Sequence, residues 1–166
     1  AVQAMAQIVR AAEMETAGLC DHADLGGFDP ASVFLARTAA VGAMELKAKM
    51  ILCDTNLGFA ARLLASYRCP VPVYACTHTN RVTRELALSF GIYPFCMERG
   101  NVLDDMIRAE LQHLVDQKRL APEDMVVIMA ATPDRTMGAN MLEFNTARSR
   151  LCAEAPRAAQ QVVTAG

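Results

Sequence analysis

The chain has 166 residues, of which 53% are hydrophobic and 20% charged, so it can bury one core and is too apolar to stay disordered. Its formal net charge is -2 with both signs interspersed, which excludes a basic surface for nucleic acid or membrane and favours proteins or small molecules as partners. No apolar run approaches the roughly 18 residues that span a bilayer. The six cysteines form no C-x-x-C pair and are typical of buried thiols in a reducing compartment, so we expect a cytoplasmic protein.

Two helices are expected before any strand. Apolar residues at helical spacing predict the first, from about Val2 to Met14. After a polar, glycine-containing link, Asp29 is expected to cap a second helix that runs from Pro30 to about Lys47. Small residues from Ala39 to Ala43 would let this helix pack closely against a neighbour.

Short apolar runs then alternate with helical stretches, which indicates a parallel sheet covered on both faces. The last strand follows a loop too short for a helical crossover and should pair antiparallel. We therefore predict a three-layer α/β/α domain over residues 1–148, with two opening helices, a five-stranded sheet and a tail at 149–166 that is compatible with a short helix. The expected strands are Met50 to Cys53, Val71 to Cys76, Tyr93 to Met97, Met125 to Met129 and Met141 to Thr146; the expected helices between them are Gly58 to Tyr67, Asn80 to Phe90 and Val102 to Gln117.

The first turn from strand to helix, Asp54 to Gly58, carries the most chemistry. A helix N-terminus exposes unpaired N–H groups and the positive end of the helix dipole, Thr55 offers a hydroxyl, and Gly58 lets the backbone approach a ligand. Such a turn can bind a phosphate. The pattern equally fits an ordinary capped turn, because the chain has neither a dinucleotide fingerprint nor a P-loop. At the end of the next strand, Thr79 is expected to cap the following helix.

Catalytic and metal-binding patterns are not evident. The histidines His22, His78 and His113 are far apart in sequence, with no cysteine or carboxylate at ligand spacing, so we predict no metal site. Asp104 and Asp105 open a helix, where acidic side chains oppose the dipole, and are interpreted as helix-start charges. We predict no catalytic residue in this chain.

Seven segments in chain order carry a family resemblance. They are Ala1 to Glu13, Thr38 to Ala43, the turn with Thr55 and Gly58, Ala65 to Pro70, Thr77 with Arg84, Gly91 to Pro94, and Gly138 to Asn140. In this order they resemble the C-terminal domain of pyruvate kinases, over nearly the whole chain to about Thr146. The resemblance implies a regulatory and oligomerisation domain of a glycolytic enzyme. The parent would transfer a phosphoryl group from phosphoenolpyruvate to ADP, with Mg²⁺ and K⁺, in a barrel domain absent from this chain.

The resemblance also implies an effector site for a phosphorylated ligand. It would use the first turn, with Thr55, Asn56 and Gly58, and the late loop, with Arg135 and Thr136. Relatives that bind fructose 1,6-bisphosphate have a first turn rich in Ser, Thr and a basic residue, and only Thr55 and Gly58 match here. Fewer charge-assisted hydrogen bonds should weaken phosphate binding.

In the resembled family the last strand and the opening helices form a subunit contact. We therefore expect a homo-oligomer, with Ala39, Ala43, Met141 and Phe144 at the interface. A first residue of Ala, with a helical pattern already running, predicts a fragment whose partner is the rest of a pyruvate kinase chain. The fragment itself is expected to need no cofactor.

Two other classes of function stay open. One is a free-standing module of the same fold that binds a phosphate-type ligand, and the other is a small enzyme with its site at the carboxyl ends of the strands. The coding frame upstream of Ala1 separates the first from a pyruvate kinase, because only a pyruvate kinase should encode a barrel there with carboxylates that bind magnesium.

Overall fold

Five strands form one sheet in the computed structural model, which describes residues 2–15, 27–132 and 138–152. The strands lie in the order β3-β2-β1-β4-β5. Neighbours from β3 to β4 are parallel, and β5 pairs antiparallel with β4, which confirms the predicted sheet. The strands are β1 (Met50–Asp54), β2 (Val73–Thr77), β3 (Ile92–Cys96), β4 (Met125–Ala130) and β5 (Met141–Thr146).

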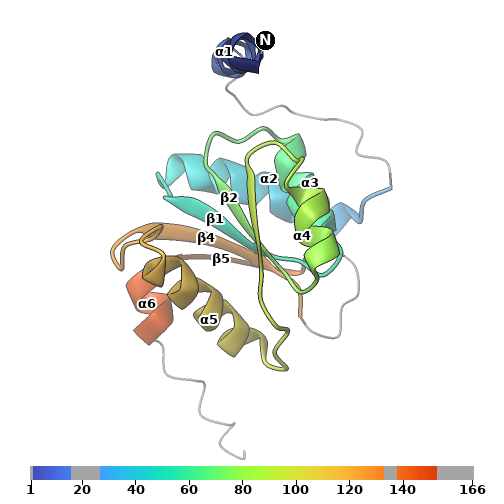
Figure 1. The fold of residues 1–166 in the computed structure, drawn as a ribbon. Coiled ribbons are helices and arrows are strands. Elements are labelled where there is room, and N and C mark those ends of the chain that lie inside the picture. Colours follow the sequence, from blue (N-terminus) through green and yellow to red (C-terminus); the bar gives the residue numbers. More distant parts are fainter. Residues whose placement is uncertain (1, 16–26, 133–137, 153–166) are drawn as a thin grey trace, which may run out of the picture.

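Helices cover both faces of the sheet, as a three-layer α/β/α domain requires (Figure 1). Side chains of α2, α3 and α4 pack in a core cluster on one face, and those of α5 and α6 pack in a second cluster on the other. The helices are α1 (Val2–Glu15), α2 (Pro30–Glu45), α3 (Phe59–Ser66), α4 (Asn80–Leu86), α5 (Leu103–Asp116) and α6 (Ala147–Cys152).

The central strand β1 contributes to both cores because its side chains alternate between the two faces. All of its residues are buried. Ile51 and Cys53 belong to the cluster under α2 and α3, whereas Met50 and Leu52 belong to the cluster under α5. A strand covered on both faces needs a continuous apolar run, which is the pattern that predicted this strand.

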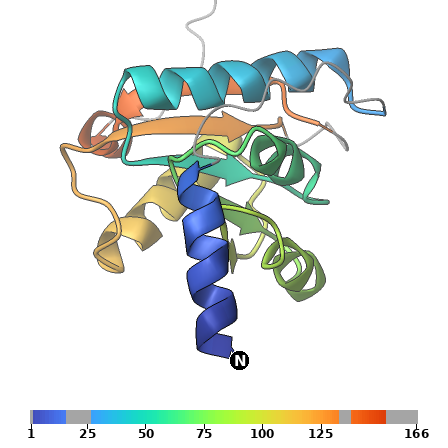
Figure 2. The ribbon, with the colours of Figure 1, turned by 90° about the horizontal axis from the view of Figure 1, so that it is seen from above.

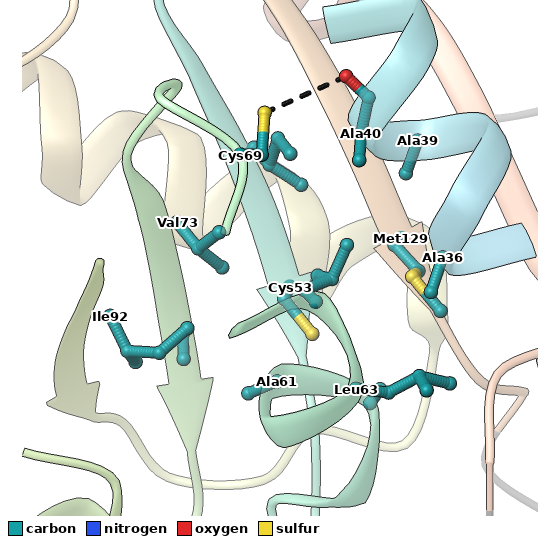
Figure 3. Close-up of a cluster of buried hydrophobic side chains, with 14 of the residues drawn as sticks. Ala36, Ala39, Ala40, Cys53, Ala61, Leu63, Cys69, Val73, Ile92 and Met129 are labelled. Carbon is teal, nitrogen blue, oxygen red and sulfur yellow. Dashed lines mark hydrogen bonds between the residues drawn. The ribbon is translucent and has the colours of Figure 1, made fainter. Parts of the chain in front are cut away.

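The small residues of α2 lie inside the domain. Ala36, Ala39, Ala40 and Ala43 are fully buried in the first core cluster (Figure 3). The Cys69 thiol donates a hydrogen bond of 3.6 Å to the carbonyl oxygen of Ala40. Contrary to the expectation from the family, Ala39 and Ala43 have no exposed surface with which to contact another subunit, because they bring α2 close to the sheet.

Both predicted helix caps are confirmed. A carboxylate oxygen of Asp29 accepts a hydrogen bond from the backbone N–H of Ser32 at 3.1 Å, at the start of α2. The hydroxyl oxygen of Thr79 accepts from the N–H of Val82 at 3.4 Å, at the start of α4. Each cap satisfies one of the unpaired donors at a helix N-terminus.

Two further helices flank the rest of the fold in the sequence: α1 comes before α2, and α6 follows β5. Helix α1 was predicted, and Figure 1 shows it apart from the sheet, whereas in the view of Figure 2 it is seen in front of the sheet. Its apolar residues Val2, Met5, Ile8 and Val9 are 53–80% exposed. Helix α6 spans the boundary expected at residue 148, and residues 153–166 of the predicted tail lie outside the described residues.

Candidate functional site

A crevice lies at the carboxyl ends of the parallel strands. The chain leaves β1 for β2 through α3 on one face and returns from β3 to β4 through α5 on the other, so the direction of winding changes between β1 and β4. Open α/β sheets bind ligands at such switch points. The crevice is lined by Asp54, Thr55, Asn56, Leu57, Phe59, His78, Arg99, Met106, Ala131 and Gly138.

The turn after β1 forms one wall of this crevice. The hydroxyl oxygen of Thr55 accepts a hydrogen bond from the N–H of Gly58 at 3.1 Å, which closes the turn before α3. Gly58 has a φ of 79°, in the left-handed region. A Cβ on Gly58 would lie 3.2 Å from Leu86 and 3.3 Å from Val82. The missing side chain of Gly58 therefore faces α4, while Thr55 and its neighbour Asn56 face the crevice.

The guanidinium of Arg99, a residue that was not predicted as part of the site, lies beside Asn56. With its amide oxygen turned toward Arg99, Asn56 accepts from the two terminal guanidinium nitrogens at 3.1 and 3.3 Å. Arg99 follows β3, and open α/β sheets bind ligands at the carboxyl ends of their strands. Its position in the sequence could therefore have marked it as a candidate site residue. The other two expected effector residues, Arg135 and Thr136, lie outside the described residues, and Gly138 next to them lines the crevice.

The floor of the crevice holds a buried pair of Asp54 and His78. His78 Nε2 is 2.9 Å from Asp54 Oδ1, and both side chains are 8% exposed. His78 Nδ1 is 3.2 Å from the carbonyl oxygen of Met97. The hydrogen bond to Asp54 raises the pKa of His78, against the opposing effects of burial and of the nearby Arg99. Since both ring nitrogens face acceptors, the geometry favours the imidazolium.

A buried acid, Glu110 of α5, lies behind this pair. Its side chain is 2% exposed, and its Oε2 has no hydrogen-bond partner among the described residues. Burial, and then the negative charge of Asp54, raise the pKa of Glu110 to about 8, although a hydrogen bond from the Cys76 thiol opposes the shift. Glu110 is therefore mostly a neutral carboxylic acid at neutral pH.

The comparisons with known proteins identify the family. The family model described as "Pyruvate kinase, alpha/beta domain" matches residues 34–144. The chain belongs to this family. It is 33% identical over 106 residues to a pyruvate kinase of Borreliella burgdorferi, with 62% of this chain and 22% of that protein covered. It is 30% identical over 99 residues to a pyruvate kinase of Sporosarcina psychrophila, with 60% and 17% covered.

Solved structures share the fold. A Cryptosporidium parvum pyruvate kinase in complex with ADP superposes with a TM-score of 0.65 at 19% identity, over 74% of this chain and 25% of that one. A second structure of the Cryptosporidium parvum enzyme gives 0.61 at 21% identity, over 72% and 23%. This pyruvate kinase alpha/beta domain spans about a fifth of the length of the two curated relatives named above.

The described part of this pyruvate kinase alpha/beta domain contains no group of three or more His, Cys, Asp or Glu side chains that could hold a metal ion. Within the same residues, no helix is both long and apolar enough to cross a membrane. The charged or titratable side chains that line the crevice in the described part of the chain are Asp54, His78 and Arg99.

Proposed function

We propose that this chain is the C-terminal regulatory and assembly domain of a pyruvate kinase. Its parent would transfer a phosphoryl group from phosphoenolpyruvate to ADP in cytoplasmic glycolysis, with Mg²⁺ and K⁺ bound in the catalytic domain. Family membership and the small share of each relative that the chain covers support this proposal. The purified chain alone should give no pyruvate above background in an assay with phosphoenolpyruvate, ADP and both metal ions.

The observation that carries the regulatory role is the crevice at the switch point. Thr55 and Asn56 line it next to Arg99, and α3 begins directly beside it with no side chain capping its first amides. Hydroxyl, amide and guanidinium donors close to a helix N-terminus suit an anion, so we infer that the effector is a small phosphorylated molecule. Gly58 shapes the turn, and Arg135 and Thr136 stay proposed contacts from the late loop.

Thermal shift and calorimetry with a panel of sugar phosphates and nucleotides test this site. A ligand at 100 times its dissociation constant should stabilise the folded chain by about 2.7 kcal/mol. Asn56→Ala and Arg99→Ala should each weaken binding about tenfold. Each variant removes a side chain that donates to the anion and also removes the hydrogen bond between the two residues. Arg119→Ala, outside the crevice, is the matched control. An anion that binds equally well to all three variants would place the site elsewhere.

The two edges of the sheet differ in their capacity for assembly. The N–H of Val73 donates to Gly91 and that of Met97 to Thr77, both at 3.0 Å, so alternate positions of β3 bond to β2. Of the positions between them that face the open edge, the central one is Pro94, which has no N–H to offer another strand. Self-association through a strand edge is therefore expected at β5.

The surface beside β5 supplies the apolar area. A groove between α2 and β5 is lined by Phe34, Val41, Leu46 and Phe144 among others, and Phe34 is 68% exposed. Met141, which was expected beside Phe144, packs instead with the core cluster under α5 and α6. We propose that the parent enzyme forms a homo-oligomer through Phe144 and this outer face of α2, without Met141.

A further inference from the structure

Four titratable side chains line up on the α5 side of the sheet. On β2, Cys76 has the parity of Tyr74, which packs under α5, and it contacts Glu110; His78, just after the strand, has the same parity. On β1, Asp54 has the parity of Leu52, which packs under α5. Glu110 projects from α5 toward Cys76 and the charge of Asp54. The group thus runs from the crevice, which Asp54 and His78 line, into the core.

Each end of this group depends on a bound proton. His78 meets a carboxylate at 2.9 Å and a carbonyl at 3.2 Å, so both of its nitrogens must carry hydrogen to satisfy these contacts. Glu110 has a fully buried oxygen without a partner among the described residues, so its ionised form would be an uncompensated buried charge.

We propose that the crevice is a proton-gated anion site, in which His78 and Glu110 must both hold a proton for an anion to bind. This inference rests on the proposed effector site and adds its regulation. With both protons bound, the imidazolium balances the Asp54 carboxylate and Glu110 is neutral. When both protons leave, Asp54 and Glu110 are like charges with no imidazolium to balance them, and they repel an anion held at Asn56 and Arg99.

The other charged and titratable groups around the cluster do not replace these protons. The hydrogen bond to Asp54 raises the pKa of His78, and Arg99, which stays charged, opposes part of this rise. Burial raises the pKa values of Cys53 and Cys76, so both thiols stay neutral through this range. The pKa of Glu110, raised to about 8, places its own transition in the mildly alkaline range. The gate should therefore close between neutral and mildly alkaline pH.

Calorimetric titration with inorganic sulfate tests the gate, because sulfate keeps its charge throughout this pH range. The dissociation constant of the wild-type chain should rise by roughly tenfold or more from pH 6 to pH 9. Binding near pH 8 should take up protons, which is measured by repeating the titration in buffers with different ionisation enthalpies. A dissociation constant that does not change with pH, or binding without proton uptake, would overturn the gate and leave the anion site standing.

Two matched variants test whether the pH dependence of sulfate binding comes from this cluster or from another titratable group. Glu110→Gln cannot ionise, so it should lose a large part of the rise above pH 7 while it still binds sulfate at pH 6. His113→Gln changes a histidine of the same helix that stacks on Phe95, and its pH profile should match that of the wild type. A profile of Glu110→Gln identical to that of the wild type would overturn the role of Glu110. The absence of sulfate binding at every pH would overturn the anion site and the gate together.

Discussion

The aromatic ring of Phe144 on β5 lies directly against the backbone of Gly42 on α2. A Cβ placed on Gly42 would be 2.4 Å from Cε1 and 2.8 Å from Cζ of that ring. Real side chains do not tolerate such distances, so this glycine sets how closely the ring of the edge strand can approach the helix. Since Phe144 is 38% exposed, the contact lies at the surface that we propose for assembly.

Gly42→Ala should therefore lower the free energy of unfolding by about 1–3 kcal/mol, because the new methyl group displaces the ring. The double variant with Phe144→Ala provides the control. Without the ring, alanine should stabilise the helix by about 1 kcal/mol over glycine. Urea unfolding of the four proteins in this cycle measures both effects. A loss of stability for Gly42→Ala that persists without Phe144 would show that the ring is not the cause.

Glu110→Gln should stabilise the chain at alkaline pH. The pKa of Glu110 is about 8 in the folded chain, above the ordinary value of 4.5 for a glutamic acid, so the folded state holds the proton longer. The resulting cost is absent below pH 4.5, grows as pH rises and is complete above pH 8. The variant should be more stable by a few kcal/mol at pH 8.5 and close to wild type at pH 5.

The pH dependence of His78 has the same sign. Its raised pKa stabilises the fold below the unfolded value near 6.5, and this contribution is lost as pH rises through the folded value. Glu110→Gln should consequently flatten the decline of stability with pH without abolishing it. Chemical denaturation from pH 5 to 9 checks this, with the exposed Glu98→Gln as control. Parallel curves for wild type and Glu110→Gln would contradict the assigned protonation of Glu110.

The sequence predicted the sheet well because each strand is a local pattern. The limits of β5 agree with the strand predicted after the short loop, and Asp29 caps α2 as its side-chain chemistry suggests. Helix α4 ends at Leu86, before the expected Phe90, since the N–H of Ser89 turns back to donate to the Leu86 carbonyl oxygen at 2.9 Å. Local propensity does not determine such an end.

The polar cluster was harder to predict because it is assembled by the fold. Asp54 and His78 are far apart in sequence and meet only because adjacent parallel strands end side by side. Glu110 did leave a signal: it lies within the stripe of Met106, Ile107 and Leu111 that faces the sheet, where a charged residue is rarely found. The same reasoning could not separate buried Ala39 from an interface residue, because small residues favour close packing in either place.

Phe34→Ser should weaken self-association without unfolding the chain. Phe34 is 68% exposed and lines the groove beside β5, so its loss removes apolar interface area and little core. Sedimentation velocity near 100 μM, which corresponds to an association free energy of about 5.5 kcal/mol, should show oligomer for wild type and monomer for the variant. Leu88→Ser is the control, because Leu88 is 92% exposed and lies outside the groove. A wild-type chain that is monomeric at this concentration would contradict assembly through this domain alone.

Gly58→Ala should destabilise the chain more than it weakens anion binding. Alanine at a φ of 79° costs about 1–2 kcal/mol, and its Cβ would press on Val82 and Leu86 at 3.3 and 3.2 Å. These contacts lie toward α4 and not toward the crevice, so sulfate affinity of the folded variant should fall less than that of Asn56→Ala. Gly58→Val should show the same order with a larger loss of stability, because its branched side chain adds atoms to the same contacts. Thermal unfolding and sulfate calorimetry on the three variants measure both quantities. A Gly58→Ala chain with wild-type stability that no longer binds sulfate would show instead that the glycine serves the approach of the ligand.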